Sequence, residues 1–274
     1  MQPILRRLSS LYAVSMTIAV AALIPMPAPA QSLDEIVSQN GCRNCDLRLR
    51  ELRELKLQSA NFRDTILREA DLKEAVLIES DFREADLRRA ELERAKLHYS
   101  NFSGASMRAV DMEKANMTGA KFIDADLRNA DLNETELAGA DFSGADLRQS
   151  SLIRSNASNA VFREAKMDNV DLERTNLTNA DLSEARLKQS DLDRVFARGA
   201  NFEGADLSGV RLSSADLTDA NLRGTDLTNA LLRHTRLAGA DLTDATGLSQ
   251  DRIIGACGDD RTKLPSGITL EPCS

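Results

Sequence analysis

Two of the four cysteines stand close together: Cys42 and Cys45 are separated by two residues, whereas Cys257 and Cys273 lie near the other end of the chain. A C-x-x-C spacing is typical of thiol–disulfide exchange and of one half of a structural zinc site. A thioredoxin-like site needs a strand followed by a helix, and zinc needs two further ligands nearby. Cys42 has neither a strand followed by a helix nor two further zinc ligands nearby. The sequence therefore favours structural cysteines and predicts no metal site.

Catalysis would need a nucleophile, a base or metal ligands that converge in one pocket. The only histidines, His98 and His234, are far apart in the sequence, and the aspartates recur at a fixed interval instead of forming a cluster. A repeating interval is the mark of a fold requirement and not of an active site. The sequence therefore predicts a protein that is not an enzyme, with no catalytic residue and no cofactor.

Six arginines recur at intervals of twenty residues, and Asp168 then breaks the run. We call them the Arg column: Arg48, Arg68, Arg88, Arg108, Arg128 and Arg148. An aspartate stands two residues before four of them, at Asp46, Asp86, Asp126 and Asp146. A row of cations could dock an anionic polymer or an acidic partner, which makes the column a candidate docking site. The alternative is a solvated ladder in which arginines and aspartates neutralise one another.

A repeat of five residues must position these side chains, as in Ala-Asp-Leu-Arg-Arg and Ala-Asp-Phe-Ser-Gly. A large apolar residue, the centre of each unit, occupies every position ending in 2 or 7 from Leu47 to Leu242, except at Ala157 and Ala197. Two residues before each centre, from position 60 to position 245, the chain carries only Ala, Ser, Thr or Val. A period of five fits neither an α-helix nor a long strand. The chain must therefore turn a corner every five residues.

Seven of the eight phenylalanines lie on one twenty-residue lattice, in which Leu182 fills the gap: Phe62, Phe82, Phe102, Phe122, Phe142, Phe162 and Phe202. If four five-residue sides make one coil, residues twenty apart stack, and these rings form a column inside one wall. The 40 units then make about ten coils. At ~4.8 Å between neighbouring coils, the rod is about 48 Å long. Its narrow interior explains why aromatic residues are only 4% of the chain.

The repeated pattern Ala-(Asp/Asn)-Leu-x-x resembles that of the pentapeptide-repeat family, and the resemblance covers residues 47–245. It implies an all-β fold, the right-handed quadrilateral β-helix. Ala157 and Ala197 depart from the pattern, and each missing large centre should leave a local gap. We expect the ring of Phe196 to fill part of the gap at Ala197.

Both ends of a solenoid need covers, because the end coils expose pairing groups and interior side chains. We expect an N-terminal cap over residues 31–46 and a C-terminal cap over residues 246–274. Residues 32–35, Ser-Leu-Asp-Glu, form a capping box that predicts a short helix ending near Gly41. Residues 249–257 predict a second short helix in the C-terminal cap.

The four cysteines allow three pairings in principle. A rod of about 48 Å cannot be bridged end to end, because the Cα atoms of a disulfide lie within ~7 Å of each other. The predicted disulfides therefore join Cys42 to Cys45 and Cys257 to Cys273.

Residues 1–30 have the pattern of a secretory signal peptide, with Arg6 and Arg7, an apolar stretch from 8 to 24, and a final Ala-Pro-Ala. The apolar stretch is shorter than the ~20 residues that span a bilayer, and no other stretch could cross a membrane. Cleavage after Ala30 would remove two arginines and change the net charge from −8 to −10. We expect an exported protein, periplasmic or extracellular, where disulfides form.

Two further walls follow the Arg column around the coil. The first is predominantly acidic, and it contains Glu51, Glu54, Asp71, Glu74, Glu91, Glu93, Asp111, Glu113, Asp131 and Glu134. The second is nearly uncharged apart from Glu136, and it contains Asn116, Thr118, Asn156, Ser158, Asn176 and Thr178. The uncharged wall could receive a partner or be ordinary polar surface.

The excess of eight acidic residues argues against a nucleic-acid binder, which would be basic. The sequence predicts a non-catalytic, exported structural or interaction rod that binds a protein or an anionic polymer of the cell envelope. The resemblance implies an alternative, because the quinolone-resistance members of the family are acidic DNA mimics that bind DNA gyrase. The signal peptide and the Arg column argue against that alternative.

Overall fold

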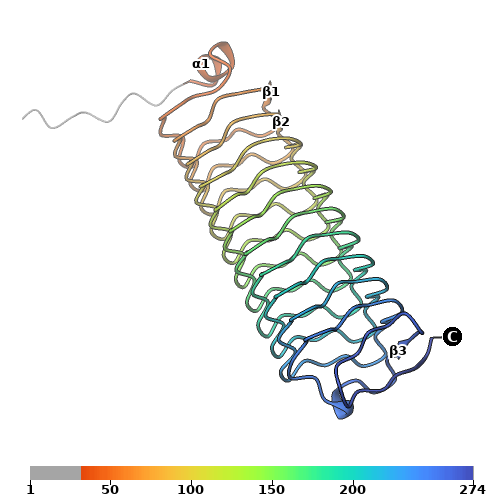
Figure 1. Cartoon of the computed structure of the whole chain (residues 1–274). Coiled ribbons are helices and arrows are strands. Elements are labelled where there is room, and N and C mark those ends of the chain that lie inside the picture. Colours follow the sequence, from red (N-terminus) through yellow and green to blue (C-terminus); the bar gives the residue numbers. More distant parts are fainter. Residues whose placement is uncertain (1–31, 274) are drawn as a thin grey trace, which may run out of the picture.

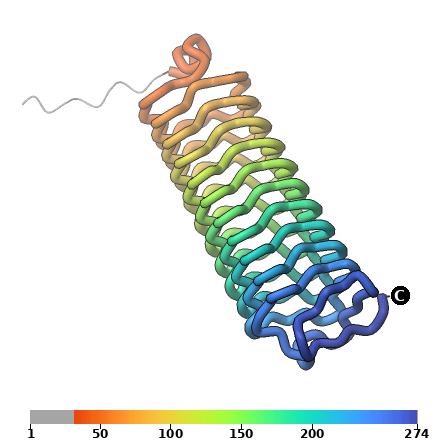
Figure 2. The backbone as a smooth tube through the Cα atoms, viewed as in Figure 1, coloured from red at the N-terminus to blue at the C-terminus, as the bar shows by residue number. Residues whose placement is uncertain are grey.

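The computed structural model describes residues 32–273, and the predicted signal peptide over residues 1–30 lies outside them. The chain winds into a rod of stacked coils (Figure 1), and a smooth trace shows the same four-sided path along its length (Figure 2). None of the helices in residues 32–273 is long and apolar enough to cross a membrane. The helices and strands of these residues are α1 (Leu33–Ser38), β1 (Lys56–Gln58), β2 (Val76–Ile78), the 3₁₀ helix η1 (Gln250–Arg252), β3 (Cys257–Gly258) and β4 (Glu271–Pro272).

A parallel ladder joins successive coils. Positions ending in 1 or 6 pair with the residue twenty positions later, beginning at Gly41 and reaching Thr246. At one step the amide of Leu67 donates to the carbonyl of Asp86 (2.8 Å), and the amide of Asp86 donates to the carbonyl of Thr65 (2.9 Å). Four such steps complete each coil, so the fold is a right-handed quadrilateral β-helix.

Each corner is a tight turn. Between Leu67 and Ala70, the amide of Ala70 donates to the carbonyl of Leu67 (3.1 Å), and Glu69 has a φ of 56°. A positive φ at the third position is the signature of a type II turn. The same position has a positive φ in every unit from Asn44 to Asp244. No Val, Ile or Thr occupies it, because a β-branched side chain is the most strained in this conformation.

The repeated Asp or Asn holds the corner in place. Oδ1 of Asp141 accepts hydrogen bonds from the amide (3.0 Å) and the hydroxyl (2.6 Å) of Ser143. Asp181 and Asp216 receive the same pair of hydrogen bonds from Ser183 and Thr218. These aspartates recur because a backbone amide at each turn needs an acceptor.

The interior contains the centres of the repeat, and all of them except the half-buried Leu57 are buried. The rings from Phe62 to Phe162 stack with centroids 4.6–5.1 Å apart and planes within 10° of parallel. Their separation matches the ~4.8 Å between paired strands. The predicted column of rings is therefore present over six consecutive coils, and Leu182 separates it from the buried Phe202.

The prediction for Phe196 is wrong, because this side chain does not fill the gap at Ala197. Phe196 is 54% exposed, and it pairs in the ladder with Asn176 and Asp216, whereas Ala197 is fully buried. Successive side chains of an extended segment point to opposite faces. The register that places position 197 inside the rod therefore places position 196 outside it.

The N-terminal cap contains the predicted helix, α1. The hydroxyl of Ser32 accepts from the amide of Glu35 (3.2 Å), and the carboxylate of Glu35 accepts from the amide of Ser32 (2.8 Å). Ile36 of the helix is fully buried at the end of the core. The capping box is thus confirmed, and the helix covers the first coil with one apolar side chain.

The C-terminal cap differs from the prediction, because the only helix in residues 249–257 is the short 3₁₀ helix η1. Gly255 has a φ of 71°, and the amide of Cys257 donates to the carbonyl of Thr235 (3.0 Å). Strand β3 then pairs in parallel with β4. Pairing with the last coil thus prevails over the local helical tendency, and the cap consists mainly of further partial coils.

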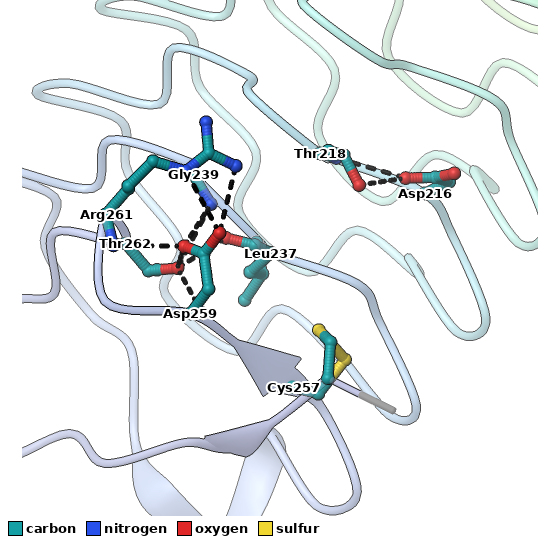
Figure 3. Close-up of a disulfide and its surroundings, with 9 residues drawn as sticks. Asp216, Thr218, Leu237, Gly239, Cys257, Asp259, Arg261 and Thr262 are labelled. Atoms are coloured by element: carbon teal, nitrogen blue, oxygen red, sulfur yellow. Dashed lines mark hydrogen bonds and ion pairs between the residues drawn. A yellow bond between two sulfur atoms is a disulfide. The ribbon is translucent and has the colours of Figure 1, made fainter.

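Asp259 and Arg261 fasten this cap to the rod beside the second disulfide (Figure 3). Oδ1 of Asp259 accepts from the amide of Gly239 (2.7 Å) and from the hydroxyl of Thr262 (3.0 Å). Arg261 bridges Asp259 (2.9 Å) and Asp219 (2.8 Å). Burial opposes ionisation, but the hydrogen bonds from Gly239, Arg261 and Thr262 lower the pKa of Asp259 to about 2.

Candidate docking surface

The members of the Arg column lie one above another on one wall, because twenty residues complete one coil. Four of them pair at 2.5–2.8 Å with the aspartate two residues earlier. These pairs are Arg48 with Asp46, Arg88 with Asp86, Arg128 with Asp126, and Arg148 with Asp146.

The other two members find their partners one coil further on, since positions 66 and 106 hold no acidic residue. Arg68 contacts Asp86 at 2.7 Å, and Arg108 contacts Asp126 at 2.6 Å. Asp86 and Asp126 thus each bind two arginines, and Asp146 also lies 3.5 Å from Arg128. The six guanidinium groups share four carboxylates, so the column and these aspartates form a paired ladder with two cations in excess.

Asp86 shows how strongly the ladder favours the ionised form of its carboxylates. Hydrogen bonds from Arg88, and to a smaller extent from Arg68, hold the pKa of Asp86 well below its usual range, although burial opposes them. The reciprocal hydrogen bond from Arg88 to Asp86 raises the pKa of Arg88. Both partners therefore remain charged at neutral pH.

Asp86 should stabilise the rod in a pH-dependent way. A carboxylate with a lower pKa in the folded chain stabilises it above the unfolded-state pKa of about 4, and this contribution is lost as the pH falls through the folded-state value. We expect Asp86→Asn to lower the free energy of unfolding by about 1–2 kcal/mol at pH 7. The difference from the unmodified protein should shrink below about pH 4, which denaturant titrations at several pH values would measure.

Asp111→Asn is the matched control for this prediction. Asp111 accepts the same kind of backbone hydrogen bond, from the amide of Glu113 (3.1 Å), but makes no ion pair within residues 32–273. Asparagine can keep the backbone hydrogen bond at either position. An equal loss of stability in the two variants would mean that the ion pairs of Asp86 contribute nothing.

Two adjoining hollows open at the corner beside the second half of the column. One, of about 310 Å³, is lined by Arg128, Arg148, Gln149, Asp168 and Asn169. The other, of about 500 Å³, is lined by Asp168, Asn169, Lys188, Gln189, Ser208, Gly209, Thr228 and Asn229. Because the two share Asp168 and Asn169, we treat them as one feature, the corner groove. Asp168, which interrupts the column, is neutralised there by Arg186, with Nε 2.8 Å from Oδ2.

The corner groove was not predicted from the sequence. A signal was present, because Gln149, Asn169 and Gln189 recur at intervals of twenty residues directly after positions in line with the column. Whether neighbouring coils leave a hollow between such side chains depends on their rotamers and sizes. That information is not contained in the repeat pattern.

The acidic wall and the uncharged wall use many of their polar groups internally. On the acidic wall, Lys73 contacts Glu91 at 3.0 Å. On the uncharged wall, Nδ2 of Asn176 donates to Oδ1 of Asn156 (3.2 Å), and Nδ2 of Asn156 donates to Glu136 (2.9 Å). These contacts favour the corner groove over both walls as a binding surface.

In the part of the chain that the structure describes, the cysteines pair with each other and the two histidines lie apart. Cys42 is bonded to Cys45 and Cys257 to Cys273. His234 lies against Gly255 of the C-terminal cap, many coils away from His98. Among residues 32–273, no three His, Cys, Asp or Glu side chains are grouped so that they could hold a metal ion.

Comparison with known sequences places the repeat in a recognised class. The family model "Pentapeptide repeats" matches eight overlapping segments: residues 56–94, 75–113, 85–122, 111–149, 140–179, 155–194, 180–224 and 211–246. No curated protein matches the chain.

The solved structures that are similar to this chain include those of three proteins. HetL, a pentapeptide repeat protein involved in heterocyst differentiation regulation from the cyanobacterium Nostoc sp. strain PCC 7120, is 28% identical, with 82% of this chain and 94% of that chain covered and a TM-score of 0.47. A pentapeptide repeat protein of the Arabidopsis thaliana thylakoid lumen is 29% identical, with coverages of 39% and 70% and a TM-score of 0.29. QnrB1, a plasmid-mediated fluoroquinolone resistance protein, is 17% identical, with coverages of 68% and 92% and a TM-score of 0.36.

Proposed function

Because the chain belongs to the pentapeptide-repeat family, we propose that it is an exported, non-catalytic rod that docks an anionic polymer of the cell envelope. Proteins of this family are generally structural or interaction proteins and not enzymes. The signal-peptide pattern of residues 1–30 supports export. The proposed docking surface is the Arg column.

One observation carries this proposal: the six arginines of the column share only four carboxylates. The side chains remain 29–54% exposed, so the guanidinium groups are accessible to a ligand. A polyanion laid along the wall would neutralise the two excess cations and could displace the shared aspartates from some arginines. Such binding weakens as salt rises, because exposed charges are screened.

The test is association with isolated cell envelopes across a range of salt concentrations. We expect the triple variant Arg88→Ser, Arg108→Ser and Arg128→Ser to bind about tenfold more weakly and with a smaller salt dependence. The triple variant Arg163→Ser, Arg174→Ser and Arg198→Ser removes the same charge away from the column, and it should bind normally. If column and control variants behave alike, the column is purely structural.

A second candidate function is binding of DNA gyrase as a DNA mimic, which the net charge of −10 after cleavage favours. Cell fractionation separates the two candidates, because gyrase is cytoplasmic. Mature protein in the periplasm would exclude the mimic. Protein in the cytoplasm with residues 1–30 intact would exclude the exported rod.

A further inference from the structure

Three side-chain amides in the lining of the corner groove are not used by the fold. The side-chain amides of Gln149, Asn169 and Gln189 form no hydrogen bond within residues 32–273. Asn156 and Asn176, on the uncharged wall, bond to each other instead. Each free amide can donate two hydrogen bonds and accept two. The groove therefore offers one unused donor–acceptor group on each of three successive coils.

The spacing of these amides sets the repeat of a suitable ligand. Equivalent residues of neighbouring coils are separated by about the 4.6–5.1 Å of the stacked rings. An extended peptide advances by ~3.3 Å per residue and would drift out of register with the amides. A 1,4-linked chain of pyranose rings advances by close to one coil spacing per ring. Its hydroxyl groups both donate and accept, as side-chain amides do.

Cations stand at both ends of the row of amides. Arg128 and Arg148 line the first hollow, and Lys188 lines the second. All three cations are already paired, Arg128 with Asp126 at 2.8 Å, Arg148 with Asp146 at 2.6 Å and Lys188 with Asp206 at 2.9 Å. A ligand carboxylate would therefore have to replace these aspartates. Asp168 does not repel such a ligand strongly, because Arg186 neutralises it.

The geometry points to an acidic polysaccharide, a chain of 1,4-linked uronic acid residues, as the ligand of the corner groove. This inference rests on the proposed function and names the class of its polymer. The amides of Gln149, Asn169 and Gln189 bind ring hydroxyls, one coil per ring, while Arg128, Arg148 and Lys188 bind carboxylates. The amides distinguish a sugar chain from other polyanions. The cations alone would bind either.

The test compares three probes on the purified protein by calorimetry at fixed salt: an oligogalacturonate, a poly-L-glutamate of matched length, and a neutral cello-oligosaccharide. We expect the oligogalacturonate to bind at least about tenfold more tightly than either of the others, as two additional hydrogen bonds to a ligand would give. The double variant Gln149→Ala and Gln189→Ala should lose about tenfold in affinity for the oligogalacturonate. Its affinity for poly-L-glutamate should stay unchanged.

Asn159→Ala with Asn179→Ala is the matched control, because these amides occupy the same turn position at another corner, also with a positive φ. The inference is overturned if poly-L-glutamate or the neutral chain binds as tightly as the oligogalacturonate, or if the groove and control variants behave alike. The proposed function survives those results if the Arg-column variant still loses envelope binding. It fails separately if that variant binds envelopes normally.

Discussion

Replacing Phe122 with alanine should lower the free energy of unfolding by about 3–5 kcal/mol. The side chain is fully buried, and its ring centroid lies 5.0 Å from that of Phe102 and 4.6 Å from that of Phe142. The four walls are fixed by hydrogen bonds between coils, so they cannot close around the space that the missing ring leaves. The loss therefore includes both the transfer of the ring and the cost of the cavity.

Phe122→Leu is the control, because Leu182 occupies the same place in a coil of the native chain. Leucine should cost about 1 kcal/mol, since most of the volume is kept. Solenoids can unfold in parts, so denaturant titration should be combined with hydrogen exchange of the amides near residue 122. If alanine costs no more than leucine, stacking and volume at this position contribute little.

The core could be predicted from the sequence because the five-residue period assigns each position a single environment. The Phe column follows from the twenty-residue spacing alone, and the rings of Phe62 to Phe162 stack as that spacing requires. The correct direction of the Phe196 side chain also follows from this register. Position 196 directly precedes a centre and must point outward.

The C-terminal cap could not be predicted in the same way, because the repeat ends near Ala245. Residues 249–257 have a local helical tendency, but their structure is decided by pairing with Thr235 and by the positive φ of Gly255. The position of the Arg column and of the four aspartates beside it followed from spacing, whereas the partners of Arg68 and Arg108 did not. That Arg68 contacts Asp86 across coils depends on side-chain conformation.

The Arg column changes the meaning of the net charge. An excess of acidic residues is compatible with a cationic wall, because the acids are distributed unequally among the walls. Because Asp86 and Asp126 each pair with two arginines, the six cations of the column lie close together and their mutual repulsion is reduced. A ligand that carries its own regularly spaced anions can take over part of this role, which is why the ligand that we propose for this wall is a polymer and not a single ion.

Replacing Cys257 and Cys273 with serine should destabilise the C-terminal cap by about 3 kcal/mol, the value expected for closing a loop of about this length. The disulfide joins residues 16 apart and holds β3 next to β4. Only two residues of each strand are paired, so β4 depends on the bond more than the part of the cap that Asp259 and Arg261 fasten to the rod. The cap should open locally while the coils above it remain folded, because each coil contacts only its neighbours.

Hydrogen exchange is the measurement that locates this effect. Protection should fall for the amides of Cys257 and Cys273, which donate to Thr235 and Gly258, and should be retained around Phe122. The matched variant Cys42→Ser with Cys45→Ser should cost less, about 2 kcal/mol, because its loop spans only 3 residues. Its loss of protection should appear at α1 and the first coil. If the C-terminal variant retains full protection at Cys257, then Asp259 and Arg261 hold the cap without the disulfide.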